Sequence, residues 1–188
     1  VPSTWVQLTP PPGEPSLAVY DDQKAEIYGT AAQRYPWRLW PSLNYDIRGL
    51  YKDSEILTRF KQRADFQYVA SLSPSFGLNG MFVGGDSTVD RRGFNPAYTK
   101  QFGTFYITRA DQPQRPSDLL VFASAHGVDP DGGQLVKGFF RIDPPMRASG
   151  ARWWTDPAES SENPTATGYV DYRHAKKACL LYTSPSPR

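Results

Sequence analysis

The sequence predicts an α+β fold in which helices come first and a small antiparallel sheet follows. The first half of the chain spaces its apolar residues as amphipathic helices do, whereas the second half holds short β-branched and aromatic runs between turn signals. Strands that follow helices, rather than alternate with them, favour antiparallel pairing. The length of 188 residues fits one domain, and the 15 Gly and 18 Pro indicate many loops.

The helical half begins after a proline-rich stretch, so we expect residues 1–16 to be an extended tether. Residues 17–33 are predicted to hold a helix, because Val19, Tyr20, Ile27 and Tyr28 are spaced like one helical stripe. Further elements are expected to be a short, buried Trp-rich segment limited by two prolines at 34–41, an amphipathic helix at 46–63, and an ambiguous element at 66–72.

The strand half is predicted to contain three strands, at 102–108, 119–124 and 135–142, with a short fourth strand at 169–172. The last ten residues, 179–188, resemble the translated read-through of a sequencing adapter. We therefore expect them to be non-native and to lie outside the fold, which leaves residues 17–178 as the globular domain. This exclusion also removes the single cysteine, Cys179.

Charge and composition exclude some functions. The net charge of +2 lacks the concentrated basic excess of a nucleic-acid-binding protein, so no nucleic-acid partner is predicted. Zinc sites usually need three or four His, Cys or carboxylate ligands, and the chain has two histidines and no cysteine outside the tail, so no metal site is predicted. Asp129 and Asp131 match only a corner of a calcium loop, so calcium stays a weak alternative to an ordinary turn.

A few other residues have a functional and a structural interpretation. Asp86 follows two glycines, which suits either an anion-binding loop or a capped turn; we favour the turn. His126 follows a predicted buried strand and is a candidate general base, although a loop histidine is the simpler interpretation. Trp153 and Trp154 suit either sugar stacking or packing, and packing is favoured.

Three stretches of the chain, 73–86, 115–125 and 168–178, resemble the globular part of bacterial prepilin-type proteins. The similar group is the pseudopilin-like one with a C-terminal His-x9-Asp-Gly motif. The resemblance makes His174 the histidine of that motif. It also implies Asp-Gly at 184 and 185, where this chain has Ser184 and Pro185. The departure begins after residue 178, so we expect the family's last apolar strand to be lost and the sheet edge to be left unpaired.

The resemblance implies a structural subunit of a type II secretion or type IV pilus-like filament, with no catalysis and no cofactor. It also implies a leader and an apolar helix of about 20 residues upstream of Val1. That helix would anchor the full-length protein in the inner membrane, with the globular part periplasmic or on the cell surface. The expected partners are other pilin-like subunits and the membrane assembly platform.

Two other functions stay open from the residues themselves. A secreted carbohydrate-binding module would use Trp153 and Trp154 as stacking platforms. A hydrolase would use His126 or His174 together with an aspartate. The sequence shows no nucleophile motif beside either histidine, so the structural subunit is the leading hypothesis.

Overall fold

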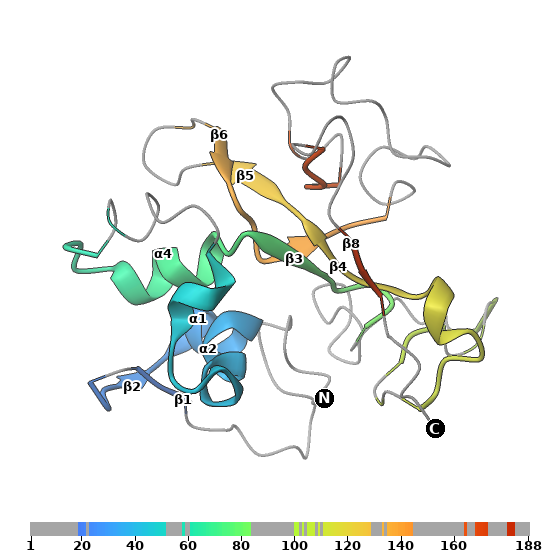
Figure 1. Cartoon of the computed structure of the whole chain (residues 1–188), viewed down its shortest axis with the longest axis horizontal. Helices are drawn as coiled ribbons and strands as arrows, with labels where there is room; N and C mark the ends of the chain where they lie inside the picture. The colour runs from blue at the N-terminus through green and yellow to red at the C-terminus, as the bar shows by residue number, and fades with distance from the viewer. Residues whose placement is uncertain are drawn as a thin grey trace.

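The computed structural model has an α+β fold in which short helices lie beside a small sheet and share a hydrophobic cluster with it (Figure 1). None of the helices among the described residues is long and apolar enough to cross a membrane. The structure describes residues 19–21, 23–51, 58, 61–83, 100–101, 103, 105–107, 109, 111–128, 133, 135–144, 164, 168–172 and 180–182.

The described chain begins with a two-stranded ribbon, so the helix predicted over 17–33 is largely wrong. Strand β1 (Val19–Tyr20) pairs antiparallel with β2 (Glu26–Ile27). The Asp21 carboxylate closes the turn by accepting the backbone N–H groups of residues 23 and 25, at 2.9 and 2.8 Å. Local side-chain bonding of this kind favours a turn over a helix.

Three short helical elements follow: α1 (Gly29–Gln33), α2 (Tyr35–Leu39) and the 3-10 helix η2 (Trp40–Leu43). Each of the last two begins with a proline in its first turn, where the missing N–H costs nothing. The prediction of a short segment with buried Trp37 and Trp40 is confirmed, because these rings are 2% and 6% exposed.

The helix predicted over 46–63 is confirmed only at Thr58 among the residues described there, and the start of the segment differs from the prediction. Ile47–Leu50 forms the 3-10 helix η3, capped by the Asp46 carboxylate on the N–H of Arg48, and Tyr51 is already extended. The Tyr51 hydroxyl donates to the carbonyl of Ala70, which holds Tyr51 against the next helix. Tyr51 is thereby buried between η3 and α4.

The ambiguous segment is helix α4 (Phe66–Leu72), and it completes the first core of the molecule. That core lies between the ribbon and the helices. Its buried members are Val19, Ile27, Ala31, Trp37, Trp40, Tyr51, Val69 and Ala70.

The main sheet has the order β7-β3-β4-β8. Strand β3 (Phe76–Asn79) pairs antiparallel with β4 (Leu120–Ser124), which confirms the strand predicted at 119–124. Strand β7 (Arg141–Ile142) runs parallel to β3, so the sheet is mixed rather than purely antiparallel. The 3-10 helix η4 (Pro116–Asp118) leads into β4.

The strand predicted at 135–142 is split in two. Strand β5 (His126–Val128) pairs with β6 (Leu135–Lys137), and the chain then crosses over to become β7. Gly138 makes the crossing with φ of 134°, and a Cβ there would lie 2.4 Å from the carbonyl oxygen of Ser73. Only glycine fits this close approach without a shift of the backbone.

The other predicted strands are reduced to single bridges in the part of the chain described. Within 102–108, Ile107 forms one parallel bridge with Val83. Within 169–172, Val170 forms one antiparallel bridge with Ala125. Both segments therefore lie beside the sheet at the expected places, but neither forms a ladder.

The edge of β4 is paired, contrary to the expectation from the tail. Strand β8 (Leu180–Tyr182) lies antiparallel to β4, with a register shift between Leu120 and Phe122. The expectation that residues 179–188 lie wholly outside the fold is therefore wrong for these three residues. The foreign origin of the tail remains a prediction from the sequence.

Candidate functional site

Most of the side chains singled out in the sequence lie outside the described residues. His174, the motif histidine, is one of them. The others are Asp86, Asp129, Asp131, Trp153 and Trp154. Within the described part of the chain, no group of three or more His, Cys, Asp or Glu side chains is arranged to hold a metal ion.

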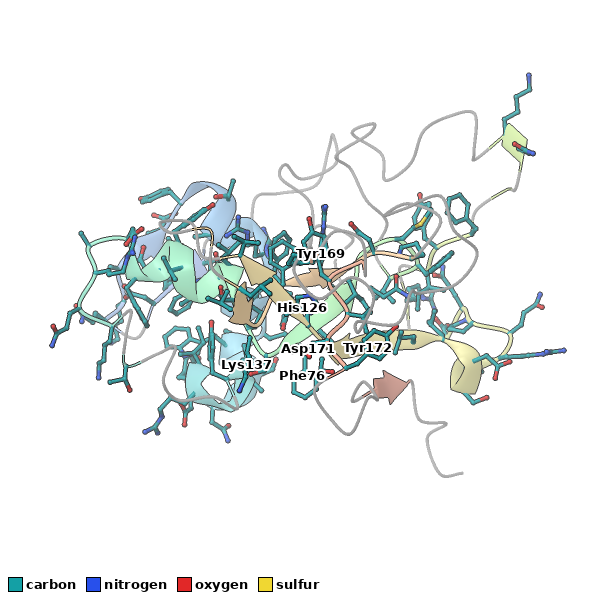
Figure 2. The ribbon with its side chains drawn as sticks, turned by 90° about the horizontal axis from the view of Figure 1, so that it is seen from above. Phe76, His126, Lys137, Tyr169, Asp171 and Tyr172 are labelled. Atoms are coloured by element: carbon teal, nitrogen blue, oxygen red, sulfur yellow. The ribbon has the colours of Figure 1, made fainter. Side chains whose placement is uncertain are left out.

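The three stretches that carry the family resemblance meet at strand β4. Ser124 of β4 lies opposite Phe76 of β3 on one side. On its other side it lies beside Asp171, whose N–H donates to the Ser124 carbonyl at 2.8 Å. Residues from 73–86, 115–125 and 168–178 are thus neighbours in space, and we take this junction as the candidate site (Figure 2).

The junction brings together Ser124, His126 and Asp171, the three residue types of a hydrolytic triad. Their arrangement is not that of a triad. The Ser124 hydroxyl donates to the main-chain carbonyl of Asp171 at 2.6 Å, and Ser124 is 2% exposed. A nucleophilic serine has to be open to substrate and to give its proton to histidine. Ser124 instead ties two chain segments together.

His126 is held in place through its backbone from both sides. Its N–H donates to the carbonyl oxygen of Tyr169 at 2.9 Å, and Lys137 is its cross-strand partner in β6. Figure 2 shows the histidine at the centre of the molecule, between these segments. The sequence prediction of a partly exposed His126 is confirmed, although it lies on strand β5 and not in a loop.

Beside this junction lies an ion pair that the sequence does not suggest. Arg141 Nη2 is 3.3 Å from Asp143 Oδ2, and the two side chains are 21% and 9% exposed. The Arg141 guanidinium also lies 5.8 Å from the ring centre of Tyr169. Tyr169 has φ of 65° and stacks on Phe139 with ring centres 4.1 Å apart. A non-glycine residue with positive φ is uncommon, so packing and hydrogen bonds must hold it there.

A second arginine, Arg34, is buried between the helices and the sheet. Its Nη1 donates to the Ser71 hydroxyl at 2.9 Å, and its guanidinium lies 4.6 Å and 4.7 Å from the rings of Tyr68 and Phe140. Burial lowers the pKa of Arg34 from its ordinary value, and the nearby charge of Arg141 acts in the same direction. Nothing in the local sequence marks this arginine as buried, so sequence reasoning missed it.

Comparison with known proteins gives no match. No protein-family model, no curated protein and no solved structure matches this chain.

Proposed function

We propose that this chain is the globular part of a pilin-like structural subunit with no catalytic role. The observation that carries the proposal is the meeting of the three resembling stretches at strand β4. Stretches that are far apart in the sequence resemble a single family in order and spacing. In the structure, two of them supply the paired strands β3 and β4, and the third joins the end of β4 through one bridge. That arrangement is what a shared fold requires of them.

Two buried polar residues of these stretches, Asn79 and Ser124, support a structural role, because their side chains bond to the backbone of the sheet and its neighbour. The Asn79 amide donates to the Leu120 carbonyl at 2.9 Å and accepts the Phe82 N–H at 3.3 Å. Ser124 bonds the main chain of Asp171 at 2.6 Å. A buried polar group that satisfies the backbone in this way fixes a fold rather than performing chemistry.

The remainder of the proposal follows from the resemblance. The full-length protein carries an N-terminal apolar helix that anchors it in the inner membrane, and the described domain lies in the periplasm or on the cell surface. Its partners are other pilin-like subunits and the assembly platform. The filament belongs to a type II secretion or type IV pilus-like system.

Antibodies raised against this chain test the proposal in the source organism. We expect them to label sheared filaments in electron microscopy and to detect the unassembled protein in the inner-membrane fraction. Antibodies absorbed with the purified chain serve as the control. Detection only as a free monomer in the culture medium would contradict the proposal.

A further inference from the structure

The β1–β2 ribbon presents two tyrosines and a glutamate on its outer face. Val19 and Ile27 point into the core and are 7% and 3% exposed. Side chains alternate along extended chain, so Tyr20, Glu26 and Tyr28 share the opposite face. Tyr20 and Tyr28 are 48% and 73% exposed, which makes them two of the most exposed large rings described. The ribbon lies at the margin of the molecule (Figure 1).

Glu26 lies between the two phenol rings. It is the direct cross-strand partner of Tyr20, and it accepts a hydrogen bond of 2.7 Å from the Tyr28 hydroxyl. This bond engages one carboxylate oxygen, Oε2, and a carboxylate has about four acceptor positions in all. The face therefore combines two exposed aromatic rings with a carboxylate that can accept further hydrogen bonds.

Asp21 orders the turn of the ribbon that carries these groups and ties this turn to helix α4. Asp21 is buried, and its Oδ1 accepts the N–H groups of residues 23 and 25. Its Oδ2 accepts from the Gln67 side-chain amide at 2.7 Å, which ties the turn to helix α4. A surface whose scaffold is already ordered loses less conformational entropy when a ligand binds.

We propose that Tyr20, Glu26 and Tyr28 form a carbohydrate-binding platform for a neutral pyranose chain. A tyrosine ring offers an apolar face with a polar tip, which suits a sugar that has C–H faces and hydroxyl edges. The Glu26 carboxylate can accept hydrogen bonds from the hydroxyl groups of a sugar. Its negative charge disfavours anionic ligands such as nucleic acid. Exposed polar neighbours, Gln23 and Lys24, make the face unsuited to an aliphatic helix.

The proposed platform does not use Trp153 or Trp154, and it does not depend on the filament role. A pilin-like subunit and a free secreted protein could each carry it. Failure of sugar binding would therefore leave the proposed function untouched, and failure of filament labelling would leave the platform untouched.

Titration of the ¹⁵N-labelled full chain with cellohexaose tests the proposal. We expect amide shifts confined to residues 19–28 and their contacts, saturating in the millimolar range or below. Tyr20→Ala and Tyr28→Ala should each lower the association constant roughly threefold to tenfold, as expected for the loss of one aromatic contact. Glu26→Gln should weaken binding while leaving the spectrum of the free protein nearly unchanged.

Tyr45→Ala is the matched control. Tyr45 is 64% exposed but lies elsewhere, with its ring against Trp40 at 5.0 Å, so its replacement should leave the affinity unchanged. The proposal is overturned if no amide of residues 19–28 shifts at about 10 mM cellohexaose, where a 1 mM site would be mostly filled. Equal effects of the Tyr28 and Tyr45 replacements would also overturn it.

Discussion

The buried guanidinium of Arg34 joins the helices to the sheet. Arg34 contacts Tyr68 and Ser71 of α4 and the ring of Phe140 beside β7. A buried charge is costly unless hydrogen bonds and polarisable neighbours replace its water. Arg34 has a hydrogen bond to Ser71 and aromatic rings on its guanidinium. The planar shape of the guanidinium should therefore contribute more to stability than its charge alone.

Replacement of Arg34 by lysine tests this argument. We expect Arg34→Lys to lower the free energy of unfolding by about 1–3 kcal/mol, because the charge stays buried while the planar contacts are lost. Chemical denaturation monitored by tryptophan fluorescence measures the change. Arg109→Lys is the control, because Arg109 pairs with Asp111 at 71% and 63% side-chain exposure and should cost little. Equal effects of the two changes would contradict the account.

The Asp46–Arg48 pair predicts a small pH dependence of stability. Its side-chain hydrogen bond to Arg48, followed by the bond to the Arg48 backbone, lowers the pKa of Asp46. A lowered pKa means that the stabilisation is complete above the unfolded pKa of about 4 and is lost as pH falls through the folded value. The pair is exposed, so the effect should be modest.

Asp46→Asn removes the charge but keeps a good capping residue. The variant should unfold at a slightly lower urea concentration than the parent at pH 7. The two midpoints should move toward each other between pH 7 and pH 2, because the falling pH protonates Asp46. A gap of the same size at both pH values would show that the ionised carboxylate contributes nothing.

At the scale of elements, the sequence pattern locates apolar segments better than it decides whether a segment is a helix or a strand. The apolar run of β4 is predictable because it lies between turn signals, and it is paired with a strand on each side. Val19 and Ile27 are eight residues apart, and this spacing suits one helix face as well as one face of a closed ribbon. The turn at Asp21 decides between the two, and its bond to Gln67 is long-range. Periodicity carries no information about such a bond.

Gly138→Ala tests the crossing between β6 and β7. The added Cβ would meet the Ser73 carbonyl oxygen at 2.4 Å, at a φ of 134°. We expect a loss of at least about 2 kcal/mol in the free energy of unfolding, from strain and displaced backbone.

Gly49→Ala is the matched substitution in open space, since no atom lies within 4 Å of a Cβ there. It should be neutral or stabilising by up to about 1 kcal/mol. Thermal unfolding of both variants measures the contrast. A Gly138 variant as stable as the Gly49 variant would mean that the crossing is not as close as described.

At the scale of the whole molecule, strand β8 covers the outer edge of β4. An uncovered strand edge presents unpaired N–H and C=O groups and invites association. Removal of residues 179–188 should therefore speed hydrogen exchange in Leu120–Ala123 and increase binding of a hydrophobic dye. Removal of 183–188 alone keeps β8 and is the control. Equal protection of β4 in the two shortened chains would contradict this assignment.

The candidate site was only partly predictable. The residue types around His126 could be read from the sequence, but the commitment of the Ser124 hydroxyl to the Asp171 carbonyl depends on a contact between residues 47 apart. The apolar spacing does not predict the Tyr20–Glu26–Tyr28 face, because Glu26 does not lie opposite Tyr20 in the helix that this spacing favours. Each miss traces to a tertiary contact that local spacing does not encode.

The central claim is that this domain belongs to a pilin-like structural subunit. Long-read sequencing through the locus in both directions tests it most directly. We predict an upstream basic leader followed by an apolar segment of about 20 residues, and an in-frame Asp-Gly ten residues after His174. A conventional cleavable signal peptide together with a native Ser/Pro tail would contradict the claim and favour a free secreted protein.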